Sequence, residues 1–114
     1  MDYTDRLRRL ALNDAALAAG SGVSGRTTLL DPVLDARTLA LVRIGALVAV
    51  GGASPSYEAQ VEAAVSAGAS AAEIVDVVFA VAAVAGLPRA VAAAPHVAVA
   101  LGYDLEAALG EWPA

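Results

Sequence analysis

The chain contains no cysteine and only one histidine, His96. The lack of cysteine excludes disulfide bonds, thiolate metal ligands and peroxide reduction by a thiol, because each of these needs a sulfur atom. One imidazole without a thiolate also falls short of the ligand set of a protein zinc site. We therefore expect no metal and no thiol redox chemistry.

The chain also has few charged residues, and acidic residues outnumber basic ones. Charged residues make up 17% of the 114 residues, every basic side chain is arginine, and the formal net charge is −5. Binding to nucleic acid depends on a basic face that neutralises phosphates. This charge balance excludes nucleic acid as a partner.

Long apolar runs are missing too. A membrane-spanning helix needs about 20 mostly apolar residues, whereas the longest uncharged stretches, 44–57, 77–88 and 90–103, are all shorter. The first ten residues, MDYTDRLRRL, have mixed charge and lack the apolar segment of a secretory signal. We expect no membrane partner and a cytoplasmic location.

Apolar residues, by contrast, are in excess, at 59% of the chain. A typical soluble domain has roughly 45–50%, and a chain this short has too much surface to hide the difference in its own core. The sequence therefore predicts a homo-oligomer, with the segments 36–50 and 73–86 buried between subunits.

The local signals predict about six helices and no strand. Thr4 or Asp2 can cap a first helix that ends near Gly20, and a Gly- and Ser-rich connection follows over 20–34. Asp35 can cap a second helix that stops at the glycines at 51 and 52. Ser54 can cap a third, with Pro55 at the first helical position. The fold class is therefore all-α.

The second half of the chain contains similar signals for the starts and ends of helices. Ser70 and Glu73 have the spacing of a capping box, which starts a fourth helix toward Gly86. Pro88 opens a fifth helix, and Pro95 within it predicts a kink or a break before His96. Asp104 can cap a short sixth helix.

Four segments, in this order and spacing, resemble one known family. They are LDARTLALV at 34–42, A-x-x-x-G-A-S at 64–70, E-I-V-x-V-V at 73–78, and Gly-Leu-Pro at 86–88. Together they resemble the carboxymuconolactone decarboxylase and alkylhydroperoxidase D-like family over residues 34–102. We expect one domain over 1–114, with an N-terminal helix and the connection occupying 1–33.

The resemblance implies a compact all-helical domain that assembles as a homotrimer or homohexamer. The redox branch of the family carries C-x-x-C-x-x-x-H where this chain has Ala53, Ser56 and Gln60. Both sulfurs and the imidazole are absent from these vacated redox positions, so a thiol peroxidase is excluded. The decarboxylase branch acts on a lactone carboxylate without a metal or cofactor, which leaves a cofactor-free lyase or isomerase open.

Such a reaction needs a cation that holds a carboxylate, and Arg43 is the best candidate. Its neighbours in the second helix are apolar, and a buried guanidinium without a partner would be costly. The partner is either Asp76 or Glu62, in a structural ion pair, or the carboxylate of a ligand. Arg89 is a second cation, either solvated or in a pocket.

The remaining candidates could supply proton transfer. His96 is either a core or interface residue or a proton donor, and Tyr57 and Gln60 lie beside the vacated redox positions. Ser54 is explained as an N-cap, since no base neighbours it in the sequence. Catalysis would then depend on Gln60, Tyr57 and His96, and ligand binding on Arg43, Glu62 and Arg89.

Two functions stay open at this point. One is a cofactor-free lyase or isomerase acting on a small carboxylated substrate. The other is a non-catalytic helical oligomer that binds a small apolar acid or acts as a scaffold.

Overall fold

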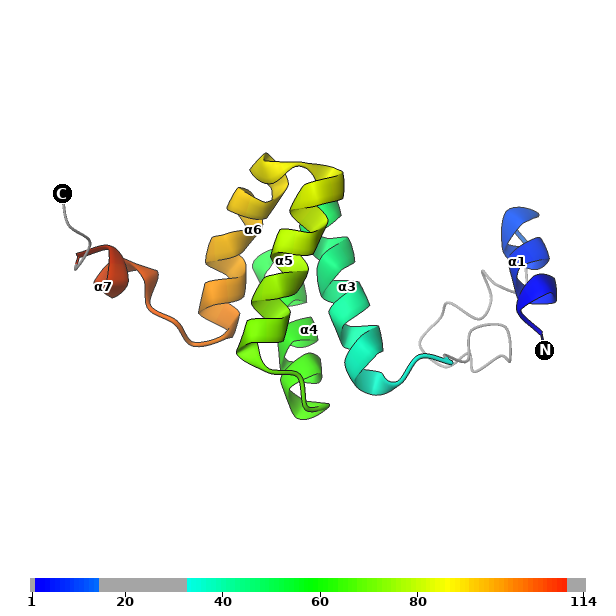
Figure 1. Cartoon of the computed structure of the whole chain (residues 1–114), viewed down its shortest axis with the longest axis horizontal. Helices are drawn as coiled ribbons and strands as arrows, with labels where there is room; N and C mark the ends of the chain where they lie inside the picture. Colours follow the sequence, from blue (N-terminus) through cyan, green and yellow to red (C-terminus); the bar gives the residue numbers. More distant parts are fainter. Residues whose placement is uncertain (1, 15–32, 111–114) are drawn as a thin grey trace. The chain divides into compact units, whose positions relative to one another are not determined.

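The structure is a computed structural model that describes residues 2–14 and 33–110. The chain divides into two compact units, Met1–Val33 and Leu34–Ala114. Within the described residues all regular structure is helical, as predicted, and the helices are labelled in Figure 1. They are α1 (Tyr3–Ala11), α3 (Ala36–Val50), α4 (Ser54–Ser66), α5 (Ala71–Ala85), α6 (Leu87–Ala100) and α7 (Leu105–Gly110).

The first unit contains α1, which Asp2 caps by accepting the amide of Asp5 at 2.9 Å. Of the two predicted caps, Asp2 is therefore the one that binds the backbone. The helix ends at Ala11, because Asn13 adopts a left-handed conformation (φ 53°). The prediction that this helix runs on toward Gly20 is wrong at this point, and its stretch beyond residue 14 lies outside the described residues.

The second unit is a bundle in which α3, α4, α5 and α6 pack together (Figure 1). Each helix contributes buried apolar residues at helical spacing, so one face of each meets the core. The core consists of Ala40, Ile44, Val48, Tyr57, Val61, Ala64, Ala69, Ile74, Val78, Ala90, Ala93 and Val97. No charged or polar side chain is buried among the described residues.

Besides Asp2, three predicted caps are confirmed. Asp35 accepts the Thr38 amide at 2.7 Å, and Asp104 accepts the amide of Ala107 at 3.1 Å. The capping box of α5 is complete, because Ser70 and Glu73 exchange both hydrogen bonds. Glu73 also forms an ion pair with Arg37, which joins the starts of α3 and α5.

The N-cap predicted for α4 is wrong, and of the kink or break predicted at Pro95 the break is absent. Ala53, not Ser54, is the N-cap of α4, and no side chain caps that helix. Helix α6 begins at Leu87 and continues through Pro95 without a break. Because Pro95 has no N–H group, the carbonyl of Val91 lacks its usual helical hydrogen bond. Pro95 and Val91 are both exposed. Water can therefore satisfy that carbonyl, and the helix persists.

Candidate functional site

The predicted site residues gather around α4, but on two different sides of it. Pro55, Ser56, Ala59 and Gln60 face α3, whereas Ser54 and Tyr57 contact His96 on α6. On a helix with 100° between successive residues, these two sets point in roughly opposite directions. The predicted catalytic trio is therefore divided: Tyr57 and His96 lie together, and Gln60 lies with Arg43.

The side that faces α3 forms an open groove with a volume of about 530 Å³. It is lined by Arg43, Ala46, Leu47, Pro55, Ser56, Ala59 and Gln60. Two of the vacated redox positions, Ser56 and Gln60, thus share a groove with the only charged side chain in its lining. Ala53, the third vacated position, is exposed at the start of α4.

Arg43 is exposed, and no ion pair joins it to any carboxylate in the described part of the chain. The expected burial of Arg43 is wrong for the single chain. Of the partners left open for it, the ion pair with Asp76 or Glu62 is absent, and both of these carboxylates are exposed as well. The buried stripe of α3 passes through Ala40, Ile44 and Val48. Arg43 lies about 100° around the helix from Ile44, outside this stripe.

On the other side of α4, the Ser54 hydroxyl lies 2.6 Å from Nδ1 of His96. The imidazole in turn stacks on the ring of Tyr57, with centroids 5.2 Å apart and an interplanar angle of 1°. Ser54 is exposed, His96 is half-buried, and Tyr57 is buried. Burial raises the pKa of Tyr57 above its usual value of 10.0, so its phenol stays protonated near neutral pH.

Sequence reasoning missed the contact between Ser54 and His96. The two residues are 42 positions apart, and no local pattern connects them. The available signal was that His96 is the single polar side chain between Ala90 and Ala100 of an apolar helix, where a half-buried imidazole needs a hydrogen-bond partner.

Arg89 and Glu62 lie outside the groove of Arg43. Nη1 of Arg89 comes within 2.7 Å of where a Cβ atom on Gly51 would stand, so Gly51 leaves room for the guanidinium. Gly51 is the left-handed C-cap of α3 (φ 80°), and the C-terminal end of a helix attracts a cation. Glu62 lines a separate groove with Glu58 and residues of α6.

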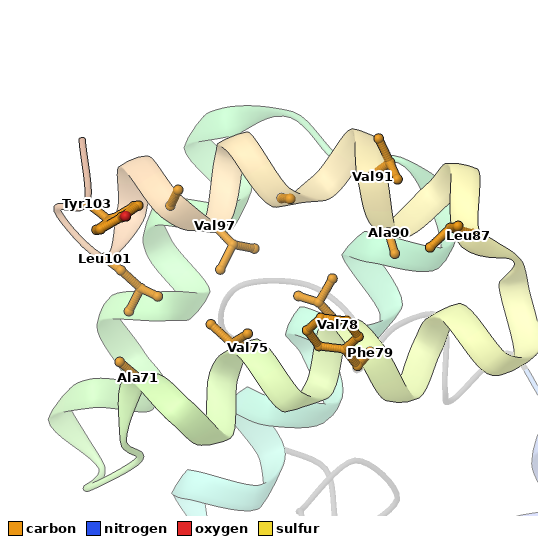
Figure 2. Close-up of a pocket in the computed structure, with 12 residues that line it drawn as sticks. Ala71, Val75, Val78, Phe79, Leu87, Ala90, Val91, Val97, Leu101 and Tyr103 are labelled. Atoms are coloured by element: carbon orange, nitrogen blue, oxygen red, sulfur yellow. The ribbon is translucent and has the colours of Figure 1, made fainter. Parts of the chain in front are cut away.

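Two further grooves are almost wholly apolar. One, between α3 and α5, is lined by Thr38 and nine apolar or glycine residues, including Val42, Gly45, Val81 and Val84. The other, between α5 and α6, has a volume of about 540 Å³ and holds Val75, Phe79, Leu87, Val91 and Tyr103 among its lining residues (Figure 2). Val84 is 92% exposed and Phe79 68% exposed in the single chain.

The described residues contain neither a group of metal ligands nor a membrane-spanning helix. Nowhere in 2–14 and 33–110 do three or more His, Asp or Glu side chains come together as metal ligands could. None of the helices in these ranges has the length and apolar character needed to span a bilayer.

Comparison with known protein families identifies the family of the chain. The profile of the Carboxymuconolactone decarboxylase family matches residues 15–100. The chain belongs to this family, as its sequence motifs predicted, and its all-helical fold agrees with that membership. The match begins before the predicted 34–102 and includes the connection that lies outside the described residues. No curated protein and no solved structure shows a significant match.

Proposed function

We propose that this carboxymuconolactone decarboxylase-like protein binds a small organic carboxylate in the groove of Arg43. The observation that carries the proposal is that Arg43 has no carboxylate partner within the described residues and stands beside two polar side chains, Ser56 and Gln60. A guanidinium binds a carboxylate through two parallel, charge-assisted hydrogen bonds. The groove therefore offers an anion site with additional hydrogen-bonding groups beside it.

The rest of the lining suits the carbon skeleton of such an acid. Ala46, Leu47, Pro55 and Ala59 present apolar surface next to the guanidinium. Ligand sites commonly combine a mostly apolar wall with a few polar groups that fix orientation. A small aromatic or unsaturated acid has both features, with its carboxylate at Arg43 and its apolar body against this wall.

Binding is favoured over catalysis by the composition of the groove. Decarboxylation also requires a group that returns a proton to carbon, and neither Ser56 nor Gln60 titrates near neutral pH. Tyr57 and His96 lie on the side of α4 that faces α6. The lyase or isomerase remains the second candidate because the chain belongs to a family that includes decarboxylases. In that case another subunit must supply the proton donor.

We also propose that the protein is a homotrimer or homohexamer in the cytoplasm. The groove between α3 and α5 falls within the segments predicted to lie between subunits, and it is apolar and open in the single chain. Covering side chains such as Val84 would remove apolar surface from water, which favours association.

Titration calorimetry with benzoate tests the carboxylate site. Arg43→Leu should weaken binding about tenfold or more, because a hydrogen bond to a charged group contributes about 1.5–3 kcal/mol. Benzamide, which has the same ring without the charge, should bind wild type and variant alike.

Arg89→Leu is the matched control, since it removes the same charge from outside the groove. It should change benzoate affinity less than about twofold. Equal losses in the two variants would show a general charge effect, and that result would contradict the proposal.

A further inference from the structure

The contact between Ser54 and His96 has the geometry of an activated hydroxyl. The distance of 2.6 Å between Oγ and Nδ1 is that of a short hydrogen bond. When the imidazole is protonated on Nε2, Nδ1 is the acceptor and the Ser54 hydroxyl donates to it. A serine beside a histidine base is the arrangement that turns a weakly nucleophilic hydroxyl into an attacking group.

We propose that Ser54 is a nucleophile and His96 its general base, in a second site that accepts acyl groups from small carboxylic esters. The pair lies across α4 from the groove of Arg43, so the inference does not rest on the proposed carboxylate site. Only Ser54 is placed in this way: Ser56 and Ser66 on the same helix have no hydrogen bond to a histidine in the described chain.

Tyr57 fixes the orientation of the base. Its ring is 1% exposed and lies parallel to the imidazole, which limits rotation of the His96 ring. In catalytic triads a third residue holds the histidine so that the correct nitrogen faces the nucleophile. Here packing against a buried ring performs that task, and Tyr57 is a positioning residue.

The position of Ser54 on α4 helps its oxygen to carry negative charge. Ser54 is the first residue of a 13-residue helix, and no side chain caps that helix end. Helix N-termini carry a partial positive charge. The amide of Ser54 can donate to an oxyanion that forms beside it, because the first amides of a helix have no acceptor within the helix itself.

The reaction balances with water as the only co-reactant. Oγ of Ser54 attacks the ester carbonyl carbon while its proton moves to Nδ1 of His96. The bond between the carbonyl carbon and the leaving oxygen then breaks, and the leaving alcohol takes the proton from the imidazolium. Water next attacks the acyl-serine with His96 again as base, which releases the acid and restores the hydroxyl.

Access to Ser54 favours a short acyl group. Ser54 is exposed, while Arg89 fills the space beside Gly51 and Leu47 fills the space beside Gly52, so Oγ is open on its solvent side only. A small ester can therefore approach Oγ from solvent.

Acetylation by p-nitrophenyl acetate tests the pair. The full-length protein is treated briefly with the reagent, digested, and mapped by mass spectrometry. Acetyl transfer to Ser54 should exceed that to Ser56 and Ser66 by about a hundredfold, since general-base assistance contributes typically 10²–10⁴ in rate. These two serines are exposed on the same helix and serve as internal controls in the unaltered protein.

His96→Gln should reduce acetylation of Ser54 to the level of the two control serines. Circular dichroism checks that the variant is folded. If it is not, the comparison of Ser54 with the two control serines in the unaltered protein still tests the proposal. Equal acetylation of the three serines, or unchanged acetylation of Ser54 in a folded His96→Gln protein, would overturn the proposal.

Discussion

The rings of Tyr57 and His96 lie parallel, 5.2 Å apart between centroids, and this stack connects the core side of α4 to α6. Tyr57 is the largest fully buried side chain of the described residues. It therefore both fills the centre of the bundle and holds the imidazole that faces Ser54.

Removing this ring should destabilise the bundle strongly. We expect Tyr57→Ala to lower the free energy of unfolding by about 3–5 kcal/mol, the usual cost of deleting a buried aromatic side chain. Tyr103→Ala is the control, because Tyr103 is 56% exposed, and it should cost less than about 1 kcal/mol. Urea unfolding at one fixed protein concentration measures both values. Similar losses for the two variants would contradict the placement of Tyr57 in the core.

Arg43→Leu should leave the free energy of unfolding within about 0.5 kcal/mol of wild type, since the side chain is exposed and has no ion-pair partner in the described residues. Glu73→Ala, by contrast, loses the capping box and the ion pair with Arg37 and should cost about 1 kcal/mol. A loss of several kcal/mol in Arg43→Leu would show that another subunit provides a carboxylate for Arg43.

Asp35 should make α3 sensitive to acid. The carboxylate of Asp35 accepts a hydrogen bond from the backbone amide of Thr38. This hydrogen bond is the main reason that the pKa of Asp35 lies below its usual value of 3.8. Because the folded pKa is lowered, the stabilisation is present above pH 3.8 and is lost as the pH falls through the folded pKa. NMR titration of the carboxyl group should show the lowered midpoint.

Asp35→Asn is the matched variant, since asparagine caps a helix without a titrating group. The decrease in unfolding free energy between about pH 5 and pH 2 should be smaller in this variant than in wild type. An identical pH dependence would mean that the cap of α3 does not contribute to acid sensitivity.

The apolar groove between α3 and α5 should control assembly. We expect Val84→Asp to lower the mass measured by analytical ultracentrifugation, because it places a charge in the groove that we propose another subunit covers. Ala83→Asp makes the same charge change at an exposed neighbour outside both apolar grooves and should leave the mass unchanged. A wild-type mass of 11.3 kDa, that of one chain, would exclude the oligomer.

The sequence predicted those features of the fold that depend on a few neighbouring residues. Asp35 and the pair of Ser70 and Glu73 were identified as caps because the donor and acceptor lie three positions apart. The all-helical class and the family followed in the same way from local motifs. Ser54 was misassigned because its residue type fits a cap, while its actual partner comes from α6.

Arg43 shows the second limit of sequence reasoning. An apolar helix indicates that its faces are covered, but it does not tell whether the same chain or another subunit covers them. Helix α3 has one face in the core and others open, and Arg43 is on an open one. The proximity of Arg89 to Gly51 was hidden for a similar reason, since it depends on how two helices cross.

A crystal structure of the assembled protein with bound benzoate would test the proposed carboxylate site most directly. We expect the benzoate carboxylate within hydrogen-bonding distance of the Arg43 guanidinium, with its ring against Leu47 and Ala59 and its oxygens near Gln60. Electron density for benzoate only at other positions, with Arg43 in an ion pair to a carboxylate of a neighbouring subunit, would contradict the account.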